Sequence, residues 1–484
     1  MNTLWDDGRL PAFARLEERL IADVAVVGGG MAGLLTAFAL RRNGVRVVLL
    51  EENRLMGGVS AQATARVSAQ HGLFCKRLID DFGLHLARQY LTAQLHAVKQ
   101  YRDLIARLGI ECDCTVQNSY VYTAPNGPDL TPERDAALRL GAPARLVAAD
   151  GLPFPVREAL CFENQIQFSP LKFFAALLPG MAIYEHSPVR DVRGHLVRCD
   201  GGSVEAEHVV ITTHFPLLEH PGHYSRRVRQ EQSYLLALSG APRLDGWYLD
   251  ADANGWDLQQ RGSTLILSGG AHRCGENPGD SFDRLRAQAR LWFPQAVETA
   301  AWSTQDCHTL DGLPYIGAYS PAAPHLHVAT GFGRWGMTNS MVCATLLTSD
   351  ILGRAYPYAD VFSPARFFPS ASIEAMMEGA LYAVRGKGRL FTAAELTAED
   401  IAPGHGGIVQ YHGRKLGLYR HTDGTLFAVR AVCPHRKRAL VWNDEEKTWD
   451  CPCHGSRFDW RGRRLQHPAK AALQAVENWG KREL

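Results

Sequence analysis

Short apolar runs separated by longer amphipathic segments dominate the first two thirds of the chain. Residues 22–27 and 209–211 are almost wholly apolar, as is typical of parallel strands buried on both faces. Residues 34–43 carry apolar side chains at helical spacing, and residues 77–108 show the same periodicity over a longer amphipathic segment. This alternation predicts an α/β fold built on a mainly parallel sheet.

Strand patterns return in the middle of the chain in a broken order. Residues 182–184, 189–199 and 208–213 read as strands, and further strands near 233–239 and 264–269 precede a helix at 281–293. The interruption predicts two intertwined domains rather than two domains in series. We expect an α/β domain from about residues 20–80, 171–215 and 300–352, and an α+β domain from about residues 81–170 and 216–299, which together occupy residues 1–352.

The pattern changes again near residue 353. Residues 353–388 are first Pro-rich, then helical, then basic and Gly-rich, which is typical of a linker. Residues 408–411, 415–421 and 426–432 form short strand patterns separated by glycine turns. We therefore predict a small all-β domain over residues 389–484.

Composition narrows the class of protein. Apolar residues make up 46% of the chain and charged residues 21%, as in ordinary globular proteins. A net charge of +2 offers no basic footprint for nucleic acid. We find no secretory signal and no apolar run of the ~18 residues that are needed to span a bilayer. The number of cysteines, 11, is odd and does not suggest a disulfide framework. These features predict a cytoplasmic protein without a membrane span.

A glycine motif follows the first apolar strand. Gly28, Gly30 and Gly33 form Gly-x-Gly-x-x-Gly before a helix, and Glu51 ends the next strand. Gly28 permits a tight turn, Gly30 lets the backbone approach a pyrophosphate, and Gly33 lets the helix pack against the strand. The helix N-terminus then faces phosphates and Glu51 accepts hydrogen bonds from ribose hydroxyls. The motif predicts a dinucleotide site.

Two further loops are suited to a cofactor or substrate. Residues 56–71 form a loop of small residues in which Arg66 can lie near a flavin ring or a substrate carboxylate; a solvated arginine is the alternative. Residues 329–339 combine a strand end, a glycine loop and the start of a helix, with Arg334 and Trp335 in the loop. The N–H groups of that helix would favour negative charge on a reduced flavin; a purely structural turn is the alternative.

The C-terminal domain carries two Cys-plus-His pairs. They read Cys433-Pro-His435 and Cys451-Pro-Cys-His454, the latter followed by Gly-Ser. This spacing suits a Rieske [2Fe-2S] centre, in which two cysteines bind one iron and two histidines bind the other. A structural zinc site with the same four ligands is the alternative, although zinc favours wider pairs.

A loose histidine cluster allows a third kind of site. His214, His220 and His223, with Glu219 as carboxylate, could form part of a mononuclear iron site, as in a Rieske oxygenase. Prolines and a glycine interrupt this segment, so no helix aligns the side chains. Surface or capping histidines are the simpler interpretation.

Several of these motifs together resemble a known composite family. They are the Gly28–Glu51 fingerprint, residues 64–72 (TARVSAQHG), residues 311–317 (DGLPYIG), residues 330–339 and residues 449–459 (WDCPCHGSRFD). Over residues 22–470 the chain resembles FAD-dependent oxidoreductases of the D-amino-acid oxidase, glycine oxidase and sarcosine oxidase superfamily with a C-terminal Rieske domain. The resemblance implies FAD and a [2Fe-2S] cluster as cofactors. It assigns FAD to a Rossmann-like α/β domain, the substrate to the intertwined α+β domain, and the cluster to the small all-β Rieske domain.

The resemblance also implies a function. We expect an FAD-dependent dehydrogenase that oxidises an amine or amino-acid-like small molecule and passes electrons from FAD through the Rieske cluster to an external acceptor. The partners would be a small-molecule substrate and an external electron acceptor or donor, for which a protein is one option. The alternative is an electron-transfer or redox-responsive protein without a dedicated small substrate.

The expected site residues fall into three sets. The substrate-facing set is Arg66, Gln70, His71, His272 and Trp335. The FAD-binding set is Gly28, Gly30, Gly33, Glu51, Ser60, Val189, Gly331, Gly336, Met337 and Thr338. The cluster ligands are Cys433, His435, Cys451 and His454.

The chain departs from its relatives at three points. Arg438 occupies the position of the cysteine that would pair with Cys453 in many Rieske proteins, so that disulfide cannot form. Phe458 replaces a tyrosine that hydrogen-bonds to the cluster in high-potential relatives, which predicts a potential between the respiratory and ferredoxin extremes. Some sarcosine-oxidase relatives attach flavin through a cysteine; Cys307 lies near that region in a different context, so we expect non-covalent FAD.

Overall fold

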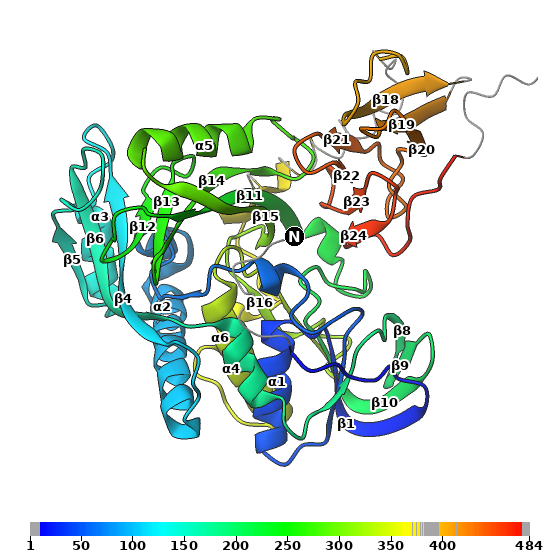
Figure 1. The fold of residues 1–484 in the computed structure, drawn as a ribbon. Coiled ribbons are helices and arrows are strands. Elements are labelled where there is room, and N and C mark those ends of the chain that lie inside the picture. Colours follow the sequence, from blue (N-terminus) through cyan, green and yellow to red (C-terminus); the bar gives the residue numbers. More distant parts are fainter. Residues whose placement is uncertain are drawn as a thin grey trace, which may run out of the picture.

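A mainly parallel sheet forms the first half of the architecture (Figure 1). The computed structural model describes residues 10–369, 371–373, 375–377, 379, 381, 396–411 and 414–476. The strand order is β16-β17-β10-β1-β2-β7, with β9 paired to β10 and β8 paired to β9. The strands are β1 (Arg19–Val27), β2 (Val47–Leu50), β7 (Ala182–Tyr184), β8 (Val189–Arg193), β9 (Leu196–Cys199), β10 (Ser203–Ile211), β16 (Tyr315–Ala318) and β17 (Leu326–Thr330).

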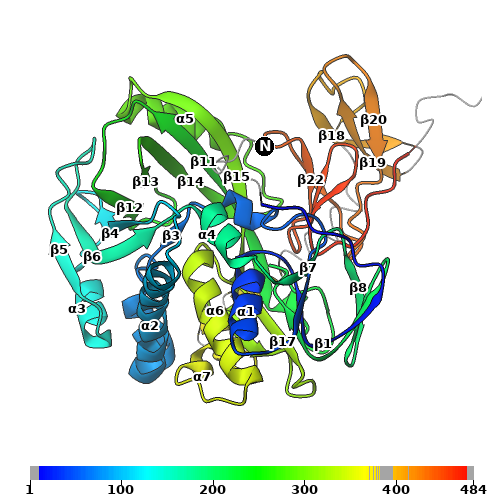
Figure 2. The same ribbon diagram turned by 60° about the horizontal axis from the view of Figure 1, so that its bottom comes forward.

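Burial on both faces explains the continuous apolar runs of the central strands. β1 pairs in parallel with β2 and with β10, and Val24, Val26 and Val210 are fully buried. Helices α1 and α6 pack against one face of this sheet, and α2 lies beside α6, as Figure 2 shows. The helices of the structure are α1 (Met31–Arg42), α2 (Cys75–Leu108), α3 (Thr131–Leu140), α4 (Pro170–Leu177), α5 (Ser281–Trp292), α6 (Gly336–Ile351) and α7 (Ala359–Phe362), with short 3-10 turns η1 (Val59–Gln62) and η2 (Tyr224–Arg226).

The long predicted helix is bent near its start. Gly83 has φ 76° and ψ 162°, a conformation that interrupts α2 and that glycine adopts without a steric penalty. The carboxylate of Glu133 accepts the backbone N–H groups of Phe74, Cys75 and Lys76, at 2.6–2.9 Å. It thereby satisfies N–H groups that have no partner within the helix.

The second sheet is mixed and contains most strands of the predicted α+β domain. Its order is β15-β11-β14-β13-β12-β4-β6-β3, with β5 beside β6. The strands are β3 (Arg66–Val67), β4 (Thr115–Thr123), β5 (Ala144–Val147), β6 (Glu158–Gln167), β11 (Val228–Ser239), β12 (Gly246–Asp250), β13 (Asp257–Arg261), β14 (Thr264–Arg273) and β15 (Val297–Thr309). Because β3 and β15 also belong to this sheet, its strands extend beyond residues 81–170 and 216–299.

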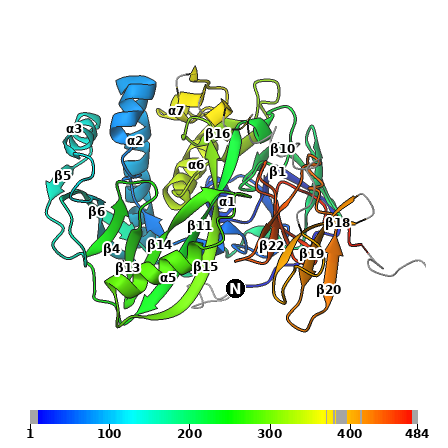
Figure 3. The ribbon, with the colours of Figure 1, turned by 90° about the horizontal axis from the view of Figure 1, so that it is seen from above.

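The C-terminal domain consists of two small antiparallel sheets. One contains β18 (Gly406–Tyr411), β19 (Arg414–Arg420) and β20 (Leu426–Val429), and the other contains β21 (Val441–Asn443), β22 (Thr448–Asp450), β23 (Arg457–Asp459) and β24 (Arg464–Gln466). In Figure 3 this domain lies at the end of the molecule opposite α3 and β5. Together, the three parts confirm the predicted fold class.

The segment predicted as a linker begins with packed residues. Val361 and Phe362 are fully buried in the first core, and the guanidinium of Arg366 makes a buried ion pair with Asp311. The basic residues 385–389 of this segment lie outside the described residues. Within the described part of the chain, no helix is long and apolar enough to cross a membrane.

Candidate functional site

A cavity of about 390 Å³ lies between the two sheets, at the carboxyl ends of β1, β2 and β10. Residues at these strand ends line it, as do the start of α6 and the cavity-facing residues of β11, β14 and β15. In open α/β sheets, ligands bind in the crevice at the carboxyl ends of the strands. The cavity volume is within the range of cofactor and ligand sites.

The glycine turn has the predicted steric role. Gly28 has φ 110°, and a Cβ on Gly33 would lie 1.9 Å from the carbonyl oxygen of Gly28. A side chain at position 33 would therefore separate α1 from the turn. Ser60 completes the cradle, because its hydroxyl accepts the backbone N–H of Met31 at 3.2 Å.

The structure gathers most residues of the predicted cofactor set around this cavity. Gly33 and Thr338 lie outside the lining: Gly33 packs against the turn and Thr338 is buried at the start of α6. The predicted residues that line the cavity are Gly28, Gly30, Glu51, Ser60, Val189, Gly331, Gly336 and Met337.

Glu51 is held in place by backbone N–H groups. Its carboxylate accepts the N–H of Gly29 at 2.7 Å and that of Asn53 at 2.8 Å. Burial raises the pKa of Glu51, while these two hydrogen bonds favour its charged form. The carboxylate stays oriented at the cavity wall, where ribose hydroxyls can reach it.

Three of the predicted substrate-facing residues form a stack. The guanidinium carbon of Arg66 lies 5.5 Å from the ring of Trp335, and that ring stacks on His71 at 4.4 Å and 11°. Arg66 lines the cavity, whereas Trp335 and His71 support it from behind. Burial lowers the pKa of His71 to about 3, so its ring is neutral and serves as a packing surface and hydrogen-bond partner of Tyr90.

The other two predicted residues lie away from the cavity lining. Gln70 is buried and donates to the carbonyl of Leu160 at 2.8 Å. His272 lies on β14, 3.2 Å from the hydroxyl of Tyr234 and 3.0 Å from the carbonyl of Arg273.

Buried charges near Arg66 were not in the predicted set. Arg334 forms an ion pair with Asp257, and Asp306 of β15 lines the cavity close to both arginines. Burial raises the pKa of Asp306 to about 7 and lowers that of Arg66 to about 10. The signal in the sequence is slight: residues 303–306 (Ser-Thr-Gln-Asp) are polar on both faces of a strand, which an ordinary half-buried strand avoids.

The four predicted cluster ligands converge at the edge of the C-terminal domain. Cys433 and His435 follow β20, and Cys451 and His454 follow β22. The two imidazole rings lie 4.9 Å apart, and their Nδ1 atoms are buried without a hydrogen-bond partner among the described residues. The hydrogen bond from Cys451 and nearby N–H groups lower the pKa of Cys433 to about 7, which favours the thiolate.

These features fit a [2Fe-2S] cluster. Two orphaned imidazole nitrogens and two adjacent thiols supply one pair of ligands to each of two irons. Ser456 contributes a hydroxyl next to Cys433, whereas Phe458 is fully buried and has no group to donate. Cys453 is a free thiol and interacts with Arg438, the residue that replaces its disulfide partner.

The mononuclear iron alternative has no support in the described residues. Glu219 is engaged by Arg436 and by the hydroxyl of Ser225, and His214 lies apart in the lining of the cavity. Across the described ranges, no group of three or more His, Cys, Asp or Glu side chains is placed to hold a single metal ion, and the cluster ligands themselves meet as one cysteine pair and one histidine pair. Cys307 is buried beside Thr330 and is absent from the cavity lining.

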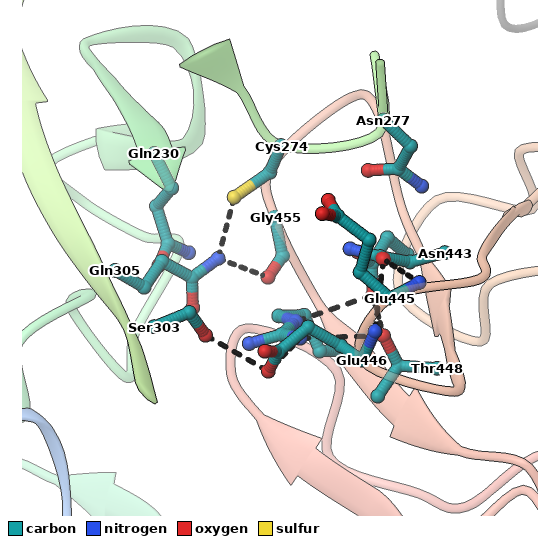
Figure 4. Close-up of polar contacts among 12 residues, drawn as sticks. Gln230, Cys274, Asn277, Ser303, Gln305, Asn443, Glu445, Glu446, Thr448 and Gly455 are labelled. Carbon is teal, nitrogen blue, oxygen red and sulfur yellow. Dashed lines mark hydrogen bonds and ion pairs between the residues drawn. The ribbon is translucent and has the colours of Figure 1, made fainter. Parts of the chain in front are cut away.

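One sheet separates the cavity from the cluster. Alternate side chains of a strand point to opposite faces. On β15, Thr304 and Asp306 line the cavity, whereas Ser303 and Gln305 face the C-terminal domain. Gln305 donates to the carbonyl of Gly455 at 2.8 Å and lies 2.9 Å from the sulfur of Cys274 (Figure 4).

Neighbouring contacts fix the same interface. Gln230 of β11 donates to the carbonyl of His454 at 2.6 Å, and Ser303 donates to Glu446 at 2.8 Å. The backbone N–H of Phe282 donates to Glu445 at 2.8 Å. The loop that carries His454 is therefore bound directly to the back of the cavity wall.

The C-terminal domain also reaches the cavity itself. Arg464 and His467 both bind the carboxylate of Glu52, which follows Glu51 in the chain, and the His467–Glu52 distance is 2.7 Å. Residues 464–467 and Lys470 line the cavity together with Glu51, Asn53 and Arg190. The nucleotide end of the cavity is thus built from both the first and the last domains.

Comparisons with known proteins agree with this division. Family profiles match residues 23–349 as "FAD dependent oxidoreductase" and residues 393–477 as "Rieske [2Fe-2S] domain". The chain is 34% identical to the Rieske 2Fe-2S iron-sulfur protein YhfW of Bacillus subtilis (strain 168) over 98% of this chain and 97% of that protein.

Shorter relatives cover the first part of the chain. Glycine oxidase of Geobacillus kaustophilus (strain HTA426) is 25% identical over 73% of this chain and 99% of its own length. In the comparison of structures, glycine oxidase from Geobacillus kaustophilus has a TM-score of 0.61 at 22% identity and covers 72% of this chain and 99% of that one. L-amino acid deaminase from Proteus vulgaris has a TM-score of 0.60 at 16% identity, covering 74% and 100%. These two structures show a shared fold.

Proposed function

We propose the following function for this chain, which belongs to the FAD dependent oxidoreductase family and ends in a Rieske [2Fe-2S] domain. It oxidises an amine or amino-acid-like small molecule, and the electrons leave through the cluster to an external acceptor. When bound, FAD accepts two electrons from a substrate carbon as hydride, and a [2Fe-2S] cluster carries one electron at a time.

The strands β11 and β15 support this proposal most directly, because one face of them lines the cavity and the other face contacts the cluster domain. Thr304 and Asp306 face the cavity, and their neighbours Ser303 and Gln305 hold the cluster domain on the other side of the same strand. The ring of Phe215 lies 6.3 Å from that of His454, and Phe215 follows His214, which lines the cavity. Packed atoms therefore connect the cavity with a cluster ligand.

The residues around the cavity have separate tasks in this proposal. The turn at Gly28 and Gly30, the N-terminus of α1 and Glu51 would bind the dinucleotide half of FAD. Gly331, Gly336 and the first turn of α6 would present N–H groups to the flavin. Cys433, His435, Cys451 and His454 would bind the two irons.

We base the proposed substrate class on the similar proteins. Two of them are named for amino acids, glycine oxidase and L-amino acid deaminase, and an amino-acid-like amine is the corresponding substrate class here. We propose the reducing cytoplasm as the compartment, since none of the eleven cysteines forms a disulfide in the structure.

Anaerobic mixing of the holoprotein with a panel of amines and amino acids tests this function. We expect one donor to bleach the flavin absorption and then to produce the EPR signal of a reduced [2Fe-2S] cluster. In His454→Ala, the flavin should still bleach while the EPR signal and the reduction of a one-electron acceptor are lost. If no donor bleaches the flavin but a reduced carrier protein or NAD(P)H does, the chain is an electron-transfer protein without a dedicated small substrate.

A further inference from the structure

The part of the cavity wall around Arg66 holds charged groups of both signs, some buried and some half-buried. The guanidinium of Arg334 is paired with the carboxylate of Asp257, which is 8% exposed. Glu231 is likewise engaged, because it lies 3.0 Å from Arg229 and 3.4 Å from His308. These groups satisfy one another and leave no net charge for a ligand.

Two charged groups remain without a hydrogen-bonded or ion-pair partner among the described residues. Arg66 and Asp306 are each 9% exposed and line the cavity. The Nη1 atom of Arg66 has no hydrogen-bond partner among the described residues, and no described residue donates a hydrogen bond to the carboxylate of Asp306. Buried polar groups are normally hydrogen-bonded, so an unpartnered pair at a cavity wall indicates a ligand that supplies both contacts.

Other carboxylates of the cavity lining are already engaged. Glu51 accepts two backbone N–H groups, and Glu52 binds Arg464 and His467. Both lie at the nucleotide end. Around Asp306 the same wall presents uncharged groups of β11, β14 and β15, namely Ser233, Leu235, Ser268 and Thr304. Within the described lining, Asp306 is therefore the carboxylate that is available to a cation.

We propose that Asp306 binds the protonated amine of the substrate, so that the cavity selects a zwitterionic amino acid whose ammonium contacts Asp306 and whose acid group contacts Arg66. This rests on the proposed function and names its substrate class more closely. Without Asp306, an ammonium group would lie near the positive charge of Arg66 and near Arg334, whose charge is already balanced by Asp257.

Asp306 also accepts a proton from that ammonium group. One N–H bond breaks, one O–H bond forms on the carboxylate, and the nitrogen keeps the electron pair, so the step transfers a proton and no electrons. Only the neutral amine has a lone pair that can assist removal of hydride from the adjacent carbon. Burial raises the pKa of Asp306 to about 7, which is suited to a proton acceptor near neutral pH.

Ligand pairs that differ only at the amine test the proposal. The probes are sarcosine against methoxyacetate and L- and D-proline against the enantiomers of tetrahydro-2-furoate, titrated into the oxidised holoprotein and followed by the change in flavin absorption. Each pair keeps the carboxylate and replaces the amine with an ether oxygen. We expect the amine member of at least one pair to bind more tightly, and Asp306→Asn to weaken it by about 10- to 100-fold, as for a lost hydrogen bond to a charged group.

The variants separate charge from shape. Asp306→Glu, which keeps the carboxylate, should retain part of the preference for the amine. Asp283→Asn removes a carboxylate that is 84% exposed on α5 and should leave the preference unchanged. If no amine member binds more tightly than its ether partner, or if Asp306→Asn keeps the preference, the proposal is wrong.

The same titration distinguishes this failure from failure of the proposed function. A preference for the amine that depends on Asp306, with no bleaching of the flavin by any donor, would contradict the oxidation and leave the ammonium site intact. Bleaching by a donor whose KM is equal in the wild type and in Asp306→Asn would support the oxidation and refute the ammonium site.

Discussion

The contact of Glu52 with Arg464 and His467 predicts that the Rieske domain helps to retain FAD. It joins the residue after Glu51, which we expect to bind the ribose, to Arg464 of β24 and to His467 just after it, and residues 464–467 form part of the cavity lining. Loss of this contact opens the nucleotide end of the cavity. The perturbation is Glu52→Gln, which keeps the shape of the side chain and removes its charge.

The size of the effect follows from the electrostatics of Glu52. Burial alone would raise its pKa, but the hydrogen bonds and charges of His467 and Arg464 lower it from 4.5 to about 2. A pKa change of this size means that the surroundings stabilise the charged form of Glu52 over its neutral form by about 3 kcal/mol. Because the side chain of Glu52 is 24% exposed, water screens part of this interaction. We therefore expect Glu52→Gln to weaken the docking of the C-terminal domain by about 1–2 kcal/mol, or roughly tenfold in the docking equilibrium.

The assay is the rate of FAD release. Holoprotein is diluted into a solution that traps free FAD, and flavin fluorescence is followed in time. We expect release from Glu52→Gln to be about tenfold faster than from the wild type. Arg463→Ala is the matched control, because the neighbouring Arg463 is 73% exposed and pairs with Asp459 inside the C-terminal domain.

The pH dependence has a definite sign. Since the pKa of Glu52 is depressed in the folded protein, its contribution is complete above about pH 4.5 and is lost as the pH falls toward 2. The difference between wild type and Glu52→Gln should therefore persist at pH 6 and 8. Equal release rates at pH 7 for these two proteins would refute the reasoning.

Three further predictions concern stability and the cluster. Glu133→Gln should lower the free energy of unfolding by about 1–3 kcal/mol, because three N–H groups at the start of α2 lose a charged acceptor; an unchanged denaturation midpoint would contradict this. Arg366→Ala should lower the free energy of unfolding by about 3–5 kcal/mol, since it leaves the carboxylate of Asp311 buried without its ion-pair partner. A variant in which both residues are replaced by apolar ones should recover much of that stability, which thermal unfolding measures. Phe458→Tyr should raise the reduction potential of the cluster in a redox titration, because a hydroxyl near the sulfurs would stabilise the reduced state; a potential equal to the wild type would show that position 458 does not face the cluster.

Much of the molecule could be predicted from adjacent residues. The dinucleotide turn depends on glycines within six positions and on the strands and helix that flank them, and the cluster ligands lie in two short loops, so local patterns were enough to predict both. The apolar runs of β1 and β10 likewise predicted central strands, because burial on both faces leaves no polar positions. Helix α2 was predicted as continuous and proved to be bent at Gly83, since periodicity reports which face is buried and not the backbone angle of one glycine.

The charged residues around Arg66 could not be predicted as a group, because their meeting depends on contacts between segments that are distant in the sequence. Arg66 comes from a short strand in the first hundred residues, Asp257 from β13, Asp306 from β15 and Arg334 from the loop before α6. Their meeting depends on the pairing of β11 with β14 and β15, which no local pattern specifies. His272, expected to face the substrate, lies on β14 with its ring directed to Tyr234, because the register of that strand decides which side chains reach the cavity.

The sequence by itself therefore determined the two cofactor sites and the class of fold, since each is encoded in a few consecutive residues whose backbone geometry or ligand chemistry is nearly unique. Only the tertiary structure decided that β15 is a common wall, with Asp306 on the cavity face and Gln305 on the Rieske face, and that Arg464 and His467 close the nucleotide end. The physical reason is that a strand specifies alternation, whereas the partner on each face is chosen by packing between segments up to about four hundred residues apart.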